Sequence, residues 1–180
     1  MRVIAGRFRG RRLTAPTWEG LRPTSDRLPE TLFDILGATI QGARVLDGFA
    51  GTGAVGIEAL SRGASHVAFV DDDPRAVRLI EQNLRQLGLE PAIIRAGFAD
   101  AARRLAGTAF DLVLLDPPYA ASTPGSIDST LEAAAPLVAV DGRLVIEHAA
   151  RQAMPASHAG LACRRTVRAG DSALSFYEHS

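Results

Sequence analysis

The sequence predicts an α/β fold in which a mostly parallel sheet is covered by helices on both faces. Short apolar runs alternate with longer amphipathic segments through the centre of the chain, which is typical of strand–helix–strand units. After Ile146 this alternation stops, and two further apolar runs are joined by the turn-rich sequence Ala169-Gly170-Asp171-Ser172. The sheet is therefore expected to contain seven strands and to close on a C-terminal antiparallel hairpin.

The expected strands span Arg44–Asp47, Val67–Asp71, Ala92–Arg95, Phe110–Asp116, Arg143–His148, Leu161–Val167 and Ala173–Glu178. The expected central helices span Ala54–Ser61, Pro74–Leu87, Asp100–Leu105 and Ser126–Leu137. Pro74 suits a first helical turn because its missing N–H has no partner there, and Gly88 suits a C-terminal stop. An earlier helix is expected from a cap at Ser25 or Asp26 to about Leu36.

The composition predicts one globular domain over residues 1–180, in the reducing cytoplasm. Hydrophobic residues make up 47% and charged residues 22% of the chain, and no apolar run reaches the ~18 to 20 residues of a membrane span. The arginine-rich N-terminus lacks the apolar core of a secretory signal. Cys163 is the only cysteine and is expected to be a small buried side chain in a strand. The four histidines lack metal-ligand spacing, so no metal is expected.

Residues 1–20 predict a basic N-terminal arm that forms a short β-hairpin or an extended segment. All 20 basic residues of the chain are arginines, although its net charge is zero. Five arginines fall in the first twelve residues, with no acidic residue among them: Arg2, Arg7, Arg9, Arg11 and Arg12. This clustering favours binding to nucleic-acid phosphates. The alternative, a codon bias toward arginine, explains the missing lysine but not the clustering.

A glycine-rich turn between a strand and a helix predicts a nucleotide-like cofactor site. Gly51, Gly53 and Gly56 form the pattern G-x-G-x-x-G, and Asp71 ends the next strand 20 residues after Gly51. Glycines allow a sharp turn and a close approach of the backbone to a ligand. A carboxylate at Asp71 can accept hydrogen bonds from both ribose hydroxyls. This pattern fits a nicotinamide cofactor as well as S-adenosylmethionine.

Asp47 favours S-adenosylmethionine. It lies four residues before Gly51, where a pyrophosphate would be repelled and the ammonium and sulfonium of S-adenosylmethionine attracted. The alternative is that Asp47 only caps the loop. Of Asp72 and Asp73, at least one is expected to cap the helix that begins at Pro74.

A buried strand that ends in Asp116-Pro117-Pro118-Tyr119 predicts the methylation of an amino group on an aromatic base. The lone pair of such a nitrogen is delocalised into the ring, which makes it a poor nucleophile. Hydrogen bonds from its N–H groups to the Asp116 carboxylate and the Pro117 carbonyl would free the lone pair, and Tyr119 can stack on the base. A simple strand-terminating turn would explain the prolines but not the four residues together.

The chain resembles the bacterial small-subunit (16S) ribosomal RNA guanine-N2 methyltransferases of the RsmD type. The central motifs look like those of the Rossmann-like class I amino-methyltransferases, which have a seven-stranded sheet. The narrower resemblance rests on Arg2-Val-Ile-Ala-Gly-Arg-Phe-Arg-Gly-Arg-Arg-Leu13, Leu21-Arg-Pro-Thr-Ser-Asp-Arg27, Glu30-Thr-Leu-Phe33 and Gly170-Asp-Ser-Ala-Leu-Ser-Phe-Tyr177. Together with the central motifs, the similarity covers nearly the whole chain.

The resemblance implies a site for S-adenosylmethionine and a site for ribosomal RNA within the small subunit. The expected cofactor-binding residues are Asp47, Phe49, Ala50, Gly51, Gly53, Asp71, Asp72, Gly97, Phe98 and Asp116. The expected substrate-binding residues are Arg2, Arg7, Arg9, Arg11, Arg12, Arg22, Thr24 and Tyr119. Two departures stand out: Pro29 replaces a basic residue, and Phe98 replaces a short polar residue at the adenine, where it would supply an apolar wall.

Two other functions remain open from the sequence. The same tetrapeptide fits an adenine-N6 or cytosine-N4 methyltransferase acting on DNA or another RNA, although no insertion is large enough for a separate target-recognition region. A non-catalytic RNA-binding protein on the same scaffold would tolerate the loss of either motif, yet both are intact. A monomeric cytoplasmic enzyme without a membrane partner is expected.

Overall fold

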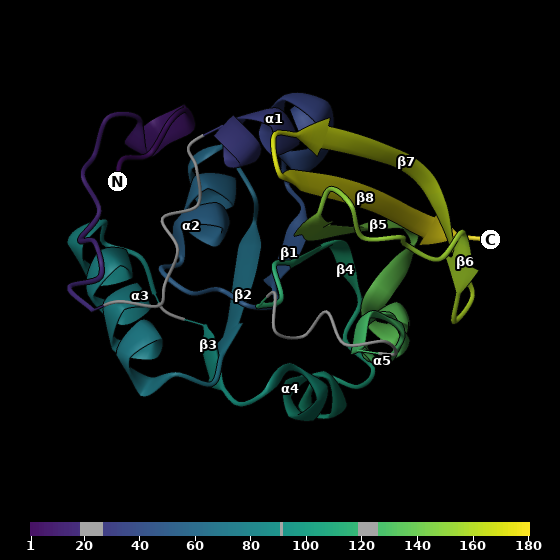
Figure 1. Ribbon diagram of the computed structural model, residues 1–180. Coiled ribbons are helices and arrows are strands. Elements are labelled where there is room, and N and C mark those ends of the chain that lie inside the picture. The colour runs from purple at the N-terminus through teal and green to yellow at the C-terminus, as the bar shows by residue number, and fades with distance from the viewer. Residues whose placement is uncertain (19–26, 91, 119–125) are drawn as a thin grey trace.

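The structure is a computed structural model that describes residues 1–18, 27–90, 92–118 and 126–180 (Figure 1). Its sheet has the strand order β3-β2-β1-β4-β5-β8-β7-β6. The strands are β1 (Arg44–Asp47), β2 (His66–Asp71), β3 (Ile93–Arg95), β4 (Phe110–Leu115), β5 (Val138–Ala149), β6 (Ser157–His158), β7 (Leu161–Ala169) and β8 (Ser172–His179). In Figure 1 this order runs from β3 on the left to β6 on the right.

The expected architecture is confirmed. Strands β3, β2, β1, β4 and β5 pair in parallel, whereas β8 pairs antiparallel with both β5 and β7. The two-residue strand β6 adds an eighth strand to the seven expected. Strand β5 begins at Val138 rather than at Arg143, because it pairs with Phe110 before an irregularity in the register. Cys163 lies in β7, half-buried.

The helices also follow the expected order. They are α1 (Arg27–Leu36), α2 (Ala54–Ser61), α3 (Pro74–Gln86), α4 (Phe98–Arg104) and α5 (Ser126–Ala134), with 3-10 turns η1 (Gly6–Phe8), η2 (Gly37–Ile40) and η4 (Ala135–Leu137). Helix α4 begins two residues before the expected Asp100, with Gly97 as its N-cap. The caps expected for α1 at Ser25 or Asp26 lie outside the described residues.

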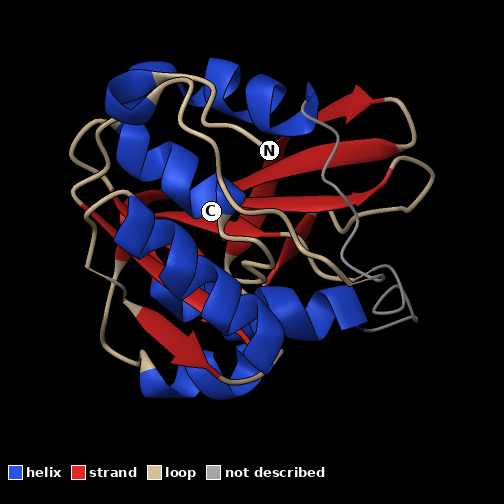
Figure 2. Cartoon of the chain, turned by 90° about the vertical axis from the view of Figure 1, so that its left-hand side faces the viewer, coloured by secondary structure: helices blue, strands red, loops and turns tan. Residues whose placement is uncertain are grey.

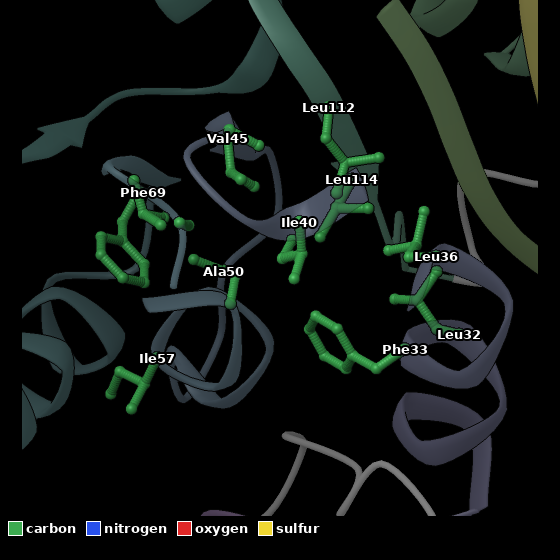
Figure 3. Close-up of a cluster of buried hydrophobic side chains, with 14 of the residues drawn as sticks. Leu32, Phe33, Leu36, Ile40, Val45, Ala50, Ile57, Phe69, Leu112 and Leu114 are labelled. Atoms are coloured by element: carbon green, nitrogen blue, oxygen red, sulfur yellow. The ribbon is translucent and has the colours of Figure 1, made fainter. Parts of the chain in front are cut away.

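Two hydrophobic layers lie on opposite faces of the sheet. Neighbouring strand residues alternate between them, so Val45 belongs to one layer and Leu46 to the other. Helices α1, α2 and α3 cover the first layer, and α4 and α5 cover the second (Figures 1 and 2). Figure 3 shows part of the first layer, including Leu32, Phe33, Leu36, Ile40, Val45, Ala50, Ile57, Phe69, Leu112 and Leu114.

None of the helices within the described ranges is long and apolar enough to cross a membrane.

Candidate functional site

Three carboxylates lie at one edge of the sheet, where parallel strands end. Asp47 is the last residue of β1, Asp71 is the last residue of β2, and Asp116 follows the last residue of β4. Strands β1 and β4 are neighbours, and the chain proceeds from β1 toward β2 but from β4 toward β5. Open α/β sheets bind ligands at such a reversal of strand order, outside the carboxyl ends of the strands. The topology therefore identifies this edge as the candidate site.

The loop between β1 and α2 is hydrogen-bonded to both neighbouring strands. The Gly48 N–H donates to the Leu114 carbonyl at 2.8 Å, and the Ala50 N–H donates to the Val70 carbonyl at 2.9 Å. Within the loop, the Gly53 N–H donates to the Ala50 carbonyl at 2.6 Å. In the strand register, Asp71 and Asp116 fall on opposite sides of this loop. The loop is thus held between the two carboxylates.

The three glycines of the loop meet two different physical requirements. Gly51 and Gly53 have φ angles of 52° and 75°, in the left-handed region that favours glycine. Gly56 has no such angle, but a Cβ there would lie 2.3 Å from the ring of Phe69. Two glycines therefore permit the turn, and the third permits the close packing of α2 on β2.

Asp47 caps the beginning of α2. Its side chain is buried, and its Oδ2 accepts a hydrogen bond from the Gly56 N–H at 2.9 Å. Burial, aided by the charges of Asp116 and Asp71 and opposed by the Gly56 hydrogen bond, raises the pKa of Asp47 to about 7. The capping alternative thus describes one role of Asp47 in the fold, and its contact with a cofactor stays a prediction. Burial is the main cause of the raised pKa, and the charges of Asp116 and Asp71 add to it.

Asp47 should make the protein less stable as the pH rises. The folded protein keeps the Asp47 proton up to about pH 7, whereas the unfolded chain loses it near its ordinary pKa of 3.8. The free energy of unfolding should therefore fall between about pH 4 and pH 7, by at most about 1.4 kcal/mol per pH unit from this group. Asp47→Asn keeps an oxygen acceptor for Gly56 and removes this titration.

The measurement is urea unfolding of both proteins at several pH values. The stability of Asp47→Asn relative to the unsubstituted protein should rise across that pH range. A constant difference between the two proteins would show that Asp47 is ionised throughout.

Asp71 organises the turn before α3 as well as the glycine loop. Its Oδ2 accepts a hydrogen bond from Gly51 N–H at 2.8 Å, and its Oδ1 accepts one from Asp73 N–H at 2.9 Å. Burial and the charges of Asp72 and Asp73 raise its pKa, although these two hydrogen bonds oppose the shift. Each carboxylate oxygen can still accept a second hydrogen bond. Asp71 can therefore hold the loop and bind ligand hydroxyls together.

The two acidic residues after Asp71 differ in role. Asp73 is the N-cap of α3, because its Oδ1 accepts a hydrogen bond from the Arg75 N–H at 2.8 Å. Its pKa is lowered chiefly by the side-chain hydrogen bond with Arg75. Asp72 is exposed at the same sheet edge. The expected cap is thus Asp73, which leaves Asp72 for the predicted cofactor contact.

Phe98, the apolar wall expected at the adenine, lies behind the glycine loop. Its ring is only 8% exposed and packs in the second hydrophobic layer. It stacks on Phe49, with ring centroids 5.2 Å apart and an interplanar angle of 29°. Phe49 is half-buried in the glycine loop, and the exposed Gly97 directly precedes Phe98 at the start of α4. The accessible aromatic surface is therefore that of Phe49, supported from behind by Phe98.

The predicted catalytic string begins where β4 ends. Asp116 and Pro118 are exposed, whereas Pro117 is buried between them. Asp116 is close enough to Asp47 for its charge to help raise the Asp47 pKa. Tyr119, Arg22 and Thr24 lie outside the described residues. The sheet thus brings Asp116 to the same site as the glycine loop and Asp71.

The first fourteen residues form a basic, hairpin-like strap that packs against the helices. One isolated antiparallel bridge joins Arg2 to Arg12, and the 3-10 turn η1 forms the tip. The two arms of the strap therefore pair as in a short hairpin, with Val3 N–H donating to the Arg11 carbonyl at 3.0 Å and Gly10 N–H to the Val3 carbonyl at 2.9 Å. Val3 and Leu13 are buried in the first hydrophobic layer. Residues 1–14 are consequently an integral part of the fold.

Two polar side chains of α2 anchor this strap, and no sequence motif pointed to either of them. Glu58 accepts hydrogen bonds from the N–H groups of Ile4 and Ala5 at 2.8 and 3.0 Å. Ser61 Oγ accepts one from the Phe8 N–H at 3.0 Å. Both side chains are buried, on a helix whose other inward residues are small or apolar. The sequence signal that could have identified them is a polar residue at a helical position whose spacing predicts burial.

The strap arginines are exposed, and none takes part in an ion pair between described residues. Arg7 lies over the Phe8 ring at 4.4 Å, and Arg11 donates to the Gln86 carbonyl at 3.1 Å. Their positive charges are therefore not neutralised by carboxylates in the described part of the chain. Beyond the strap, the chain follows α3 to Trp18, whose ring lies 5.2 Å from the Arg75 guanidinium. It thereby approaches the carboxylate edge.

Comparisons with known proteins show which family and which solved structures this chain is similar to. A model of the protein family described as Conserved hypothetical protein 95 matches residues 1–178. Ribosomal RNA small subunit methyltransferase D of Escherichia coli strain K12 is 34% identical over 180 residues, covering 99% of this chain and 89% of that protein. The protein of the same name from Haemophilus influenzae is 42% identical over 123 residues, which cover 66% of this chain and 64% of that protein.

A solved structure shares the fold over its full length. The structure of yhhF from Escherichia coli matches with a TM-score of 0.86 and 32% identity, covering 100% of this chain and 98% of that chain. The family match includes the strap, the glycine loop and Asp116.

Proposed function

This chain belongs to the family described as Conserved hypothetical protein 95, the RsmD family, and on that premise we propose that it methylates the N2 amino group of a guanine in small-subunit ribosomal RNA, with S-adenosylmethionine as the methyl donor. The relatives named ribosomal RNA small subunit methyltransferase D support the substrate class. The single observation that carries the proposal is the convergence of Asp47, Asp71 and Asp116 around the glycine loop.

The charge of the site fits a cationic cofactor. Asp116 and Asp71 lie close enough to Asp47 for their charges to help raise its pKa, so a ligand with an ammonium and a sulfonium would relieve this repulsion. A pyrophosphate would add to it, which argues against a nicotinamide dinucleotide. In this proposal Asp71 and Asp72 bind the ribose side, Gly51 and Gly53 lie along the methionine part, and Phe49 lies beside the adenine.

The residues after β4 would prepare the nucleophile. S-adenosylmethionine supplies an electrophilic methyl group. Asp116 Oδ and the Pro117 carbonyl would accept hydrogen bonds from the two N–H groups of the guanine, which draws its nitrogen toward tetrahedral geometry. The Asp116 carboxylate would also lie at the proton that the methylated nitrogen must release. Tyr119 would stack on the base and exclude water.

The deciding experiment measures both the cofactor and the product. Isothermal titration should show one S-adenosylmethionine bound per chain and no binding of NAD. Tritiated methyl groups should then enter small subunits that lack the modification, and chromatography should identify N2-methylguanosine. N6-methyladenosine or a methylcytidine would establish the alternative base specificity. RNA binding without methyl transfer would establish a non-catalytic protein.

We further propose that the substrate is a small subunit that is partly or fully assembled. A strap of fourteen residues offers too small a surface to read a long sequence, so selectivity should come from the shape of folded RNA and an already exposed base. Methylation of assembled subunits should therefore exceed that of the naked transcript. Equal activity on both would remove this part of the proposal. We assign the protein to the cytoplasm, as a monomer with one domain over residues 1–180.

Neutralising strap arginines should weaken RNA binding without changing cofactor binding. Arg9→Gln with Arg12→Gln should reduce the slope of log affinity against log salt by about 0.7 to 0.9 for each phosphate that the strap no longer binds. Arg104→Gln is the matched control, because this exposed arginine lies on α4, over the opposite face of the sheet. An unchanged slope in the double variant would mean that the cluster reflects codon bias.

A further inference from the structure

One buried amide joins the basic strap to the cofactor loop. Asn83, on α3, has no exposed side-chain surface. Its Oδ1 accepts a hydrogen bond from the Thr14 N–H at 2.8 Å, and its Nδ2 donates to the Thr14 carbonyl at 3.2 Å. The same Nδ2 donates to the Thr52 carbonyl at 3.4 Å. Thr14 ends the strap, and Thr52 lies between Gly51 and Gly53, so Asn83 connects the two segments.

A second contact joins the same two segments at the end of the strap where Met1 and Leu13 meet. The Thr52 hydroxyl donates to Met1 Sδ at 3.6 Å, and Leu13 N–H donates to the Met1 carbonyl at 3.1 Å. Arg2 and Arg12, which pair next to these residues, are exposed. Two of the strap arginines therefore lie at the end of the strap that contacts the cofactor loop.

The chemistry of this junction calls for an amide. The Thr14 N–H needs an acceptor, and the carbonyls of Thr14 and Thr52 need a donor. An asparagine supplies both from one short side chain, whereas a leucine supplies neither and an aspartate supplies only the acceptor. Asparagine is therefore suited to joining two backbone segments, and its role here is more than to fill space under α3.

We propose that Asn83 is a positioning residue that couples RNA binding at the strap to cofactor binding at the glycine loop. This inference rests on the proposed function, because it assumes both ligands. Phosphate contacts that order the strap would hold Thr14, and Asn83 would transmit this order to Thr52. The loop then loses less conformational freedom when the cofactor binds, so each ligand raises the affinity for the other by the same factor.

The test is the affinity for S-adenosylmethionine measured with and without a short RNA hairpin. The intact protein should bind the cofactor about fivefold more tightly in the presence of RNA. In Asn83→Ala this factor should fall to one. The matched control is Gln86→Ala, because Gln86 donates to the Thr14 hydroxyl from the same helix at 3.3 Å, whereas Asn83 also reaches the Thr52 carbonyl of the loop. Gln86→Ala should keep the full factor.

Hydrogen exchange of the ligand-free protein provides a readout that needs no cofactor. Asn83→Ala should speed exchange at the amides of Gly51 and Gly53, and RNA should slow that exchange only in proteins that retain Asn83. Asn83→Asp, which keeps the acceptor for Thr14, provides a second variant if the alanine protein is unfolded.

The outcomes separate the two proposals. If the intact protein binds no S-adenosylmethionine, the proposed function fails, while the exchange experiment still tests the junction. If both ligands bind but RNA does not change the affinity of the intact protein for S-adenosylmethionine, the coupling is refuted and the function stands. The same conclusion follows if the fivefold increase in affinity persists in Asn83→Ala.

Discussion

Asp116→Ala should lower the rate of methyl transfer by at least about 10²-fold, the scale of a positioned group in proton transfer. Asp116 is exposed directly after four consecutive buried residues of β4, at the edge where the glycine loop lies. The alanine variant would leave one N–H of the target amino group without its acceptor. The affinity for S-adenosylmethionine should change only a few-fold. Single-turnover methylation of small subunits measures the rate, and isothermal titration measures the affinity.

Two further variants make this result specific to the carboxylate. Asp116→Asn keeps an oxygen acceptor but not the charge, so its rate should lie between those of the intact protein and Asp116→Ala. Asp141→Ala is the matched control, since Asp141 is an exposed carboxylate near the beginning of β5, at the opposite edge of the sheet. Full activity of Asp116→Ala would refute the mechanism. An equal loss of affinity and rate would make cofactor binding, the second role expected of Asp116, its main one.

Asp71→Ala should raise the dissociation constant of S-adenosylmethionine by about 10- to 100-fold, the effect of leaving buried hydrogen-bond partners unsatisfied. The substitution removes the predicted acceptor for the ribose hydroxyls. It also removes the anchors of the Gly51 and Asp73 N–H groups, which lie 2.8 and 2.9 Å from the carboxylate oxygens. The loop would then have to be ordered by the cofactor itself. Isothermal titration at constant pH measures the change.

Asp73→Ala provides the control for the Asp71 variant. Asp73 is two residues away and caps α3, so its loss should lower the free energy of unfolding by about 1 kcal/mol. It should leave the dissociation constant nearly unchanged, because its partners are Arg75 atoms outside the glycine loop. An unchanged affinity in Asp71→Ala would overturn the assignment of the ribose site.

The order of elements and most of the site follow from the amino-acid sequence alone. Strand and helix periodicity predicted α2 and β1 with the observed bounds, because both depend on local patterns of apolar residues and glycines. Each of Asp47, Asp71 and Asp116 was placed at the end of an expected strand, and the observed parallel order brings the three strand ends to one edge. This placement needed no knowledge of side-chain packing.

The use of the side chains at the site depends instead on tertiary packing. The sequence left Asp47 between a cap and a cofactor contact, and the buried hydrogen bond to Gly56 shows the cap. It suggested an apolar wall at Phe98, and the structure places that ring behind Phe49. Both outcomes depend on how far α2 and α4 lie from the sheet, a distance set by the packing of the whole layer.

The position of the strap also depends on tertiary packing. Arginine clustering predicted its charge, but its anchors are Glu58 and Asn83, which lie 54 and 69 positions from the Ile4 and Thr14 N–H groups they bind. Contacts this distant in the chain leave no periodic signal, because Glu58 and Asn83 each fit the pattern of their own helix whether or not the strap is present. The sequence composition therefore determined the positive charge of the N-terminus, and the packing of α2 and α3 determined where the N-terminus is held.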